Sequence, residues 1–291
     1  TLPYPPGVRQ CRKAAEAAGI VSLCKTLKVS RSGYYHWLCR KPSKREQVNQ
    51  SIAGVIARVH AETMQVYGSP RMHIELADRG YTVSIGRVAR LMSANDLNAK
   101  QGKRNKVRQL HRNSIPPVDN ILNRQFHADL PNIKWVSDIT FIETREGFLY
   151  LAVVLDLYSR AIVGWSMSSK IDEQLVQDAL TMAVDQRELN SGLILHSDQG
   201  SQYKAKYYQL RLQNLGIICS MSRKGECHDN AVAESFFHSL KTELICGTIF
   251  RDRLTARQAI FKYIEVFYNR KRRHSTLNYQ APLDFEIMNA A

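Results

Sequence analysis

Three acidic residues stand where the local sequence does not explain a charge. Asp138 interrupts the strand-like run KWVSDITFIE, Asp198 follows the apolar run LILHS, and Glu234 falls one turn into the helical run AVAESFFHSLK. An unpaired carboxylate inside a strand is costly, and carboxylates that converge repel one another, so they need a cation. Oxygen ligands with few nitrogens or thiols favour Mg²⁺ or Mn²⁺. The three residues therefore predict a site for divalent metal ions.

The chemistry expected of such a site is phosphodiester cleavage, because two metal ions about 4 Å apart can clamp the attacking and the leaving oxygen. Each acid alone is weak support, since a strand aspartate is usually ion-paired and a helix glutamate usually faces solvent. The combination, with 35 residues between Asp198 and Glu234, is stronger. Two nearby acids compete with Glu234, but Glu226 lies in a glycine-containing loop and Asp229 suits a helix cap. We prefer Glu234 as the third ligand.

The elements that must position these acids follow from hydrophobic periodicity. Strands are expected at 134–143, 148–160, 161–168, 192–198 and 217–220, and helices at 172–190, at 204–216, after residue 230 and at 255–274. This order predicts an α/β fold with one mixed five-stranded sheet and helices on both faces. Binding crevices in such sheets form at strand ends, and Asp198 lies at one.

Short helices are expected in front of the sheet. Residues 11–40 suggest two or three in helix-turn-helix order, with Ser30 as a cap. A second such unit follows, and its Arg71, Arg87 and Arg90 are candidates for DNA contact. Plain helical bundles with solvated arginines would give the same pattern. The expected domains are two helix-turn-helix regions at 1–45 and 46–98, a basic linker at 99–125, and a catalytic domain at 126–291 with a C-terminal helix and basic tail.

Positive charge concentrates in front of the expected sheet. The net charge is +15, and residues 1–128 carry all of it, whereas residues 129–291 hold nineteen basic and nineteen acidic side chains. This asymmetry predicts a nucleic-acid-binding front end, although a basic surface for solubility would look the same. Phosphate contacts are expected from the linker and from the run NRKRRH, namely Lys103, Arg104, Lys106, Arg108, Arg270, Lys271, Arg272 and Arg273.

Other classes of protein fit the sequence poorly. The six cysteines have no C-x-x-C spacing, and no histidine pair completes a zinc pattern, so reduced thiols are expected instead of structural zinc. No run reaches 18 apolar residues, and the first residues lack a signal-peptide pattern. We therefore expect a cytoplasmic protein without a membrane partner.

Five motifs carry a resemblance to a known family: VYGSPRMHIELADRGYTVSIGRVARLM, WVSDIT, HSDQGSQY, MSRKGECHDNAVAESFFHSLKTE and YNRKRRHSTLNYQAPLDF. Over about residues 20–286 the chain resembles the bacterial insertion-sequence transposases of the "IS-three" group, specifically their second open-reading-frame product. The resemblance implies a ribonuclease-H-like integrase core of the retroviral-integrase superfamily. It implies that Asp138, Asp198 and Glu234 are a catalytic triad that binds two Mg²⁺ or Mn²⁺ ions. The metal site expected from the residues themselves is the same one.

Further roles also follow from the resemblance. Lys241, seven residues after Glu234 and on the same helix face, matches a basic residue near the DNA end, and His196, Gln199 and Asn230 match positioning residues. The implied activity is strand cleavage and strand transfer at the terminal repeats of an insertion element and at target DNA, near the bacterial nucleoid. A homodimer or higher assembly on DNA is expected, with an upstream-frame product fused to it or assisting it.

Two alternatives stay open from the sequence. A ribonuclease-H-like nuclease would cut DNA without joining it. A helix-turn-helix regulator would bind DNA through its front end and carry an inert core.

Overall fold

The computed structural model describes residues 20–26, 28–100, 118–223 and 226–289. The chain divides into two compact units, Thr1–Val55 and Ile56–Ala291. The described part of the first unit contains α2 (Ile20–Thr26), α3 (Arg31–Leu38) and the first part of α4 (Lys44–Glu62). The Ser30 hydroxyl accepts the Gly33 N–H at 3.0 Å, which confirms Ser30 as the cap of α3. The helix expected at 11–19 lies outside the described residues.

The second unit begins with the rest of α4, α5 (Ser69–Asp78) and α6 (Ile85–Ala94). The apolar side chains on these helices that are buried include Ile56, Val59, Met72, Leu76, Val88 and Met92. They follow the helical period of the sequence, so the amphipathic pattern predicted these helices correctly. Pro70 lies in the first turn of α5. Backbone N–H groups in a first turn have no partner within the helix, so the N–H that proline lacks costs no hydrogen bond there.

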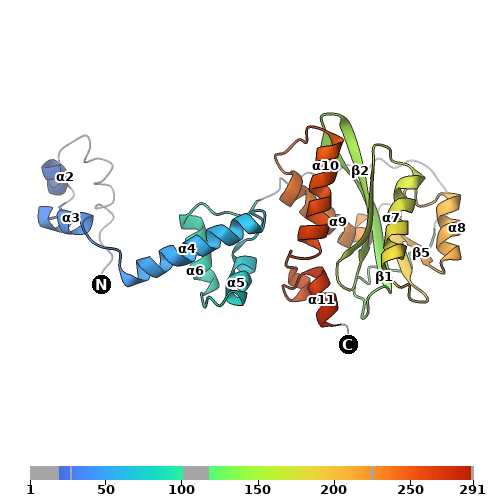
Figure 1. Ribbon diagram of the computed structural model, residues 1–291, viewed down its shortest axis with the longest axis horizontal. Coiled ribbons are helices and arrows are strands. Elements are labelled where there is room, and N and C mark those ends of the chain that lie inside the picture. Colours follow the sequence, from blue (N-terminus) through green and yellow to red (C-terminus); the bar gives the residue numbers. More distant parts are fainter. Residues whose placement is uncertain (1–19, 27, 101–117, 224–225, 290–291) are drawn as a thin grey trace. The chain divides into compact units, whose positions relative to one another are not determined.

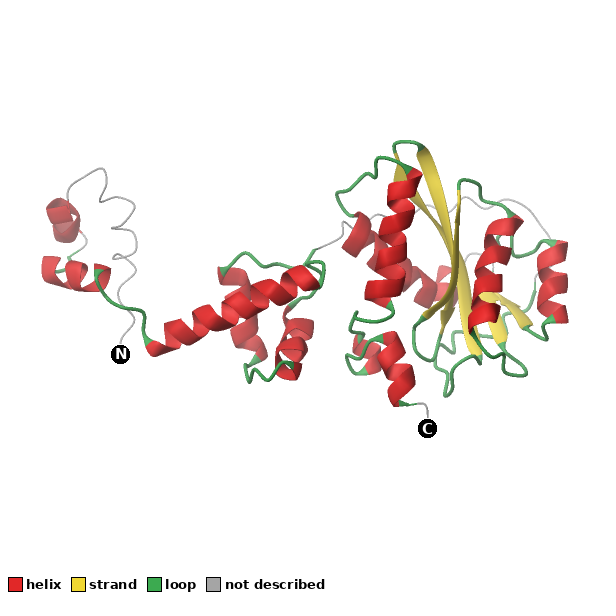
Figure 2. Ribbon diagram, viewed as in Figure 1, coloured by secondary structure: helices red, strands yellow, loops and turns green. Residues whose placement is uncertain are grey.

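Five strands of the described chain form one sheet in the order β3-β2-β1-β4-β5. Figure 2 shows these strands in yellow, with helices on either side of them. They are β1 (Lys134–Thr144), β2 (Gly147–Asp156), β3 (Ile162–Ser168), β4 (Ile194–Ser197) and β5 (Ile218–Met221). The first three strands are joined by two hairpins and pair antiparallel. β4 pairs parallel with both β1 and β5. The predicted mixed five-stranded sheet is therefore confirmed.

Helices cover both faces of this sheet. α7 (Glu173–Gln186) and α8 (Lys206–Asn214) lie on one face, and α9 (Ala231–Leu240) and α10 (Arg253–Phe261) lie on the other (Figure 1). The core under α7 and α8 contains Trp135, Val154, Leu180, Leu195 and Tyr208. Within the described ranges, no helix combines the length and apolar character that crossing a membrane requires.

Two of the helices continue into wider π-helical turns. α9 runs on as η2 (Lys241–Ile245), and α10 runs on as η3 (Lys262–Tyr268). Short 3₁₀ turns, η1 (Cys227–Asn230) and η4 (Ser275–Leu277), and a last helix, α11 (Pro282–Met288), complete the described elements. The helix expected at 255–274 thus ends at Tyr268, and the basic run after it forms turns.

α7 packs against β3 at a point where only a glycine fits. A Cβ atom on Gly164 would lie 2.2 Å from the Ala179 carbonyl oxygen and 2.8 Å from the Ala183 Cβ. These atoms belong to helix backbone and to a buried methyl group, so they have no room to move aside. The small residues on both sides let the helix lie close to the sheet.

We predict that Gly164→Ala lowers the free energy of unfolding by about 3 kcal/mol or more, because it overpacks the contact of α7 with β3. Urea denaturation measures this change. Gly54→Ala is the matched control, since a Cβ at Gly54 in α4 meets nothing within 4 Å. Alanine should stabilise that helix by about 0.5–1 kcal/mol. Equal stability of Gly164→Ala and the unsubstituted protein would contradict the close packing.

Candidate active site

The parallel pairing of β1 with β4 brings two of the predicted acids to neighbouring strands. Val136 on β1 pairs with His196 on β4, so the same register, continued by two residues, sets Asp138 beside Asp198. Neighbouring strands lie about 4.8 Å apart. Asp138 is half-buried within β1, and Asp198 is half-buried directly after β4. The two carboxyl groups therefore lie side by side at the carboxyl end of β4.

A tight turn fixes the orientation of Asp198. Its Oδ1 accepts the N–H of Gly200 at 2.9 Å. A Cβ on Gly200 would lie 2.9 Å from that same oxygen, so the absence of a side chain at this position lets the backbone approach the carboxylate. Asp138 is held in a similar way, since its Oδ1 accepts the N–H of Ile139 at 2.8 Å. Both aspartates are thus oriented by backbone donors.

The third acid comes from α9, whose N-terminal end is attached to β1. Asn230 is 4% exposed, and its Nδ2 donates to the Ser137 carbonyl oxygen at 3.1 Å. Ser137 is the residue before Asp138. Glu234 follows Asn230 by four residues, and residues so spaced lie on one helix face. The Asn230 contact therefore brings Glu234, which is exposed, to the side of β1 that carries Asp138.

The electrostatics of Asp138 show that the acids share one neighbourhood. Burial raises the pKa of Asp138 well above its usual value, and the carboxylates of Asp198 and Glu234 raise it further, while the Lys241 ammonium opposes them. Burial also raises the pKa of Asp198 and that of Glu234. Added positive charge would relieve this excess of negative charge.

The donor set fits a hard divalent cation, because it consists of carboxylate oxygens. In the part of the chain that the structure describes, however, no three His, Cys, Asp or Glu side chains are close enough together to hold an ion directly. The structure thus brings the three acids into electrostatic contact without forming a closed coordination shell.

Lys241 lies beside the acids at the first position of η2. Its Nζ is 5.1 Å from the centre of the Phe141 ring on β1. Burial lowers the pKa of Lys241, while the Asp138 carboxylate opposes that change. The ammonium group is therefore held near both the aromatic ring and the acidic centre.

His196 and Gln199 make bonds inside the protein. His196 is fully buried, and its Nδ1 and Nε2 lie 2.8 and 3.1 Å from the hydroxyls of Ser220 and Ser222. Gln199 Nε2 donates to the Ser222 carbonyl oxygen at 2.9 Å. Burial lowers the pKa of His196 to about 4, so the ring is neutral near pH 7. Both residues tie the end of β4 to the end of β5, close to Asp198.

The predicted DNA-contact residues of the front end are only partly described. Lys103, Arg104, Lys106 and Arg108 lie outside the described residues. Arg90 is exposed on α6, and Arg87 of the same helix is half-buried. Arg71 of α5, which we expected to contact DNA, lies near a protein carboxylate instead, since its Nη1 is 3.9 Å from the Glu243 side chain.

The basic run after η3 separates into two kinds of side chain. Arg270 and Lys271 are exposed. Arg272 is 5% exposed and ion-paired with Glu243 at 2.7 Å, and Arg273 is ion-paired with two carboxylates of α5. Both guanidinium groups are already matched by carboxylates, so we leave these two arginines out of the DNA contacts. The prediction treated all four alike because it rested on charge alone.

The sequence analysis missed the buried ion pairs of two further acids. Asp229, interpreted there as a helix cap, is fully buried and accepts from the side chains of Arg124 and Arg223 at 2.6 and 3.2 Å, which hold its pKa well below the usual range against the effect of burial. The other is Glu243, whose buried ion pair is described above. Arg124 is 105 residues from Asp229 and Arg272 is 29 residues from Glu243, so no local pattern indicates these two pairs.

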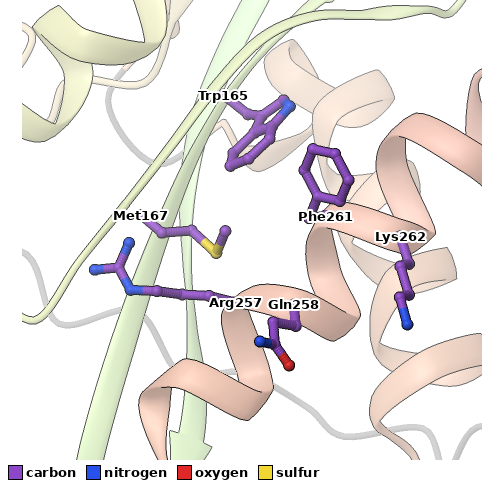
Figure 3. A pocket seen from close by; sticks show the side chains of 6 residues that line it. All are labelled: Trp165, Met167, Arg257, Gln258, Phe261 and Lys262. Atoms are coloured by element: carbon purple, nitrogen blue, oxygen red, sulfur yellow. The ribbon is translucent and has the colours of Figure 1, made fainter.

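A pocket of about 560 Å³ lies elsewhere on the domain, between β3 and the helix formed by α10 and η3 (Figure 3). Its lining side chains are Trp165, Met167, Arg257, Gln258, Phe261 and Lys262. None of them is a carboxylate, so this pocket is not a second acidic centre.

Two kinds of family model match the chain. Models described as "Integrase core domain" match residues 128–227 and 215–282, and one described as "HTH-like domain" matches residues 47–105. The integrase-core matches contain all three predicted catalytic acids, and the HTH-like match contains α5 and α6.

Curated relatives match over almost their whole length. The "Transposase InsF for insertion sequence IS3A" of Escherichia coli (strain K12) is 42% identical over 274 residues, which are 94% of this chain and 95% of that protein. The "Insertion element IS600 uncharacterized 31 kDa protein" of Shigella sonnei is 40% identical over 90% of this chain and 97% of that protein.

Solved structures of integrases are similar at lower identity. The simian T-cell lymphotropic virus intasome in complex with PP2A regulatory subunit B56 gamma gives a TM-score of 0.46 at 14% identity, over 79% of this chain and 74% of that one. The HTLV-2 integrase catalytic core domain in complex with magnesium, in its trimeric form, gives 0.41 at 18% identity, over 54% and 98%.

We predict that the free energy of unfolding falls by about 3 kcal/mol between about pH 7 and pH 4 through His196 alone. Its pKa is about 4 in the folded chain and about 6.5 in the unfolded chain. Between these values only the unfolded chain binds the proton, so acid favours unfolding. His196→Gln cannot titrate and should lose this part of the pH dependence.

Urea denaturation at several pH values measures the difference. His127→Gln is the control, since that side chain is 88% exposed, and its pH profile should run parallel to that of the unsubstituted protein. A parallel profile for His196→Gln would show that the buried imidazole is not the titrating group.

Proposed function

Since this chain belongs to the integrase-core transposases of IS3-type insertion sequences, we propose that Asp138, Asp198 and Glu234 are its catalytic residues. The chain is an enzyme of the polynucleotidyl transferase class, a DNA transposase. The proposal adds which side chains do the chemistry. It is supported above all by one observation: the β1–β4 register sets Asp138 beside Asp198, and the Glu234 carboxylate acts on the pKa of Asp138.

The reaction consists of two in-line displacements at phosphorus. In the first, a water oxygen attacks the phosphodiester at the element end, the bond from phosphorus to the 3′ oxygen breaks, and the 3′ hydroxyl is released. In the second, that hydroxyl attacks a phosphodiester of the target, and a target 3′ oxygen leaves. No covalent bond to the protein is formed, so the protein must position the reacting groups and stabilise charge.

The cofactor we propose is a pair of Mg²⁺ or Mn²⁺ ions, which when bound would acidify the nucleophile and stabilise the leaving oxyanion. The three carboxylates would hold them. Asn230 keeps α9 attached to β1 and so maintains the position of Glu234. His196 and Gln199 fix the strand ends around Asp198, and the Lys241 ammonium is placed to attract a DNA phosphate next to the acids.

DNA binding is assigned to the front end of the chain. We propose that Arg87 and Arg90 on α6 contact DNA, with Arg71 as a weaker candidate, and that Arg270 and Lys271 contact the backbone near the core. We also keep as a proposal the division into helix-turn-helix regions 1–45 and 46–98, a basic linker 99–125 and a catalytic domain 126–291.

The proposed partners follow from the reaction. Terminal repeats and target DNA must both be bound, and two element ends must be joined, so we propose a homodimer or higher assembly on DNA. An upstream-frame product, fused or separate, would supply further DNA-binding helices. The site of action would be the bacterial nucleoid.

We predict that Asp138→Asn, Asp198→Asn and Glu234→Gln each lower end cleavage and strand transfer by at least about 10³-fold, since a lost carboxylate removes several kcal/mol of transition-state stabilisation. Binding of end DNA should change little. Labelled end DNA and a plasmid target measure both steps, and gel shifts measure binding. Mn²⁺ should raise the melting temperature of the unsubstituted protein but not that of Asp138→Asn.

Glu226→Gln is the matched control, because Glu226 is an exposed acid that pairs with Arg124. It should keep nearly full activity. Activity close to that of the unsubstituted protein in any of the three acid variants would rule out this triad. Cleavage without strand transfer would instead identify a nuclease.

For DNA binding, we predict that Arg90→Ala weakens the binding of element ends and lowers the slope of log K against log salt by about 0.9, the loss of one phosphate contact. Gel shifts at several salt concentrations give the slope. Arg79→Ala is the control, since Arg79 is engaged with Glu62 and Glu75. An unchanged slope for Arg90→Ala would remove α6 from the interface.

A further inference from the structure

Glu243 is a buried carboxylate that the reaction does not use. It is 6% exposed and lies in η2, the π-helical continuation of α9. Its two oxygens accept from Nε of Arg272 at 3.0 and 2.9 Å, and one also accepts from Nη2 at 2.7 Å. The Tyr263 hydroxyl donates to it at 2.7 Å. Arg272 and the Tyr263 phenol thus hydrogen-bond its carboxylate, and the Arg71 guanidinium lies 3.9 Å away as a second, more distant positive charge.

Arg272 binds the catalytic helix at two points. Besides Glu243, its Nη2 donates to the Ser239 hydroxyl at 3.1 Å, and Ser239 lies one helical turn before Glu243. On its other side, Nη1 donates to Nε2 of His274 at 3.1 Å, and the guanidinium carbon lies 5.5 Å from the centre of the Tyr268 ring. His274 and Tyr268 thus hold the Arg272 guanidinium on one side, and on its other side the guanidinium binds one turn of the helix.

The turn that Arg272 holds is the one that carries Lys241. Lys241 lies midway between Ser239 and Glu243 in the sequence, and residues two apart on a helix point in opposite directions. Arg272 therefore binds the face of the turn that carries Ser239 and Glu243. The Lys241 side chain extends from the opposite face toward Phe141 and Asp138. A rotation of this turn would move the Lys241 ammonium away from the acidic centre.

The backbone of this turn departs from the α-helix that precedes it. η2 is a π-helix, a rare wide turn that occurs mostly as single-turn insertions inside α-helices, frequently at functional sites. A continuous α-helix would place residue 243 at a different angle around the axis. Glu243 makes its contacts with Arg272 and Tyr263 from this wide turn, so both contacts oppose a rotation of the turn.

Stability alone is a weak reason for this pair. The desolvation of two buried charges cancels much of their attraction, and an apolar replacement of similar volume is often equally stable. What a carboxylate–guanidinium pair adds is a defined geometry, because its hydrogen bonds are directional. The site of this pair, directly behind Lys241, is where geometry affects the reaction.

We propose that Glu243 and Arg272 are positioning residues that set the direction of Lys241 and thereby the placement of the DNA end at the acids. The proposal rests on the proposed function, since it acts through Lys241 and Asp138. The loss of the pair should reduce the rate of the bound complex more than its affinity for DNA.

The test is a double-mutant cycle measured as single-turnover strand transfer at saturating end DNA. Glu243→Gln should lower the rate by about tenfold or more, as expected for misplacement of a positioned group, with the dissociation constant for end DNA unchanged. The double variant with Lys241→Gln should be no slower than Lys241→Gln alone, because both changes remove the same contribution.

Glu286→Gln is the matched control. It breaks the half-buried ion pair of Arg187 with Glu286, at 2.8 Å, in which Arg187 directly follows α7 and Glu286 belongs to α11. It should lower the melting temperature by a few degrees and leave the strand-transfer rate unchanged. Tyr263→Phe keeps the ring and removes only the hydroxyl that donates to Glu243. It should also slow strand transfer, in a protein that melts a few degrees lower but stays folded at the assay temperature. This variant decides the question if Glu243→Gln does not fold.

Two results would overturn the proposal. One is a strand-transfer rate for Glu243→Gln or Tyr263→Phe equal to that of the unsubstituted protein. The other is a double variant in which the fold-reductions in strand-transfer rate of Glu243→Gln and Lys241→Gln multiply, as they would for two independent defects. Asp138→Asn distinguishes failure of the positioning role from failure of the proposed catalytic site. If Asp138→Asn is active, the proposed catalytic site is wrong. If Asp138→Asn is inactive and Glu243→Gln has a normal rate, only the positioning role is wrong.

Discussion

The parallel hydrogen bonding of β1 to β4 is the contact on which the acidic centre depends. A shift of one residue in this register would turn the Asp138 and Asp198 side chains to opposite faces of the sheet. Neither strand can relax locally, since β1 also pairs along its whole length with β2 and β4 is pinned to β5 through His196. The sheet therefore buries Asp138 next to a second carboxylate, and burial together with that like charge raises the pKa of Asp138.

The third acid is supplied by a helix that is held at both ends. At its start, Asn230 bonds the backbone of β1. Beyond its end, Glu243 bonds Arg272. Glu234 and Lys241 lie between these two points. A helix fixed in this way keeps the exposed Glu234 carboxylate and the half-buried Lys241 ammonium in place beside the strands.

Sequence pattern predicted most of the elements in this protein. The alternation and turn signals predicted five strands along the chain and one mixed sheet, and the helical period predicted α4 to α8, because burial of one face imposes the same period on any chain. The order of the strands within the sheet was not predicted. The limits of the C-terminal helix were wrong, since the hydrophobic pattern does not show that the basic run after Tyr268 turns back to bond Glu243. Ends of elements depend on such distant contacts more than their interiors do.

The sequence by itself determined which residue types could do the chemistry. These are one carboxylate inside a strand, one at a strand end and one on a helix, with a surplus of positive charge in the residues before them. Only the tertiary structure decided which charges are available. Arg270 and Arg272 are two residues apart in one basic run, yet the first is exposed and the second is buried against Glu243. Composition counts charges, whereas burial and pairing depend on which distant segment packs against each side chain, and that is fixed only when the chain folds.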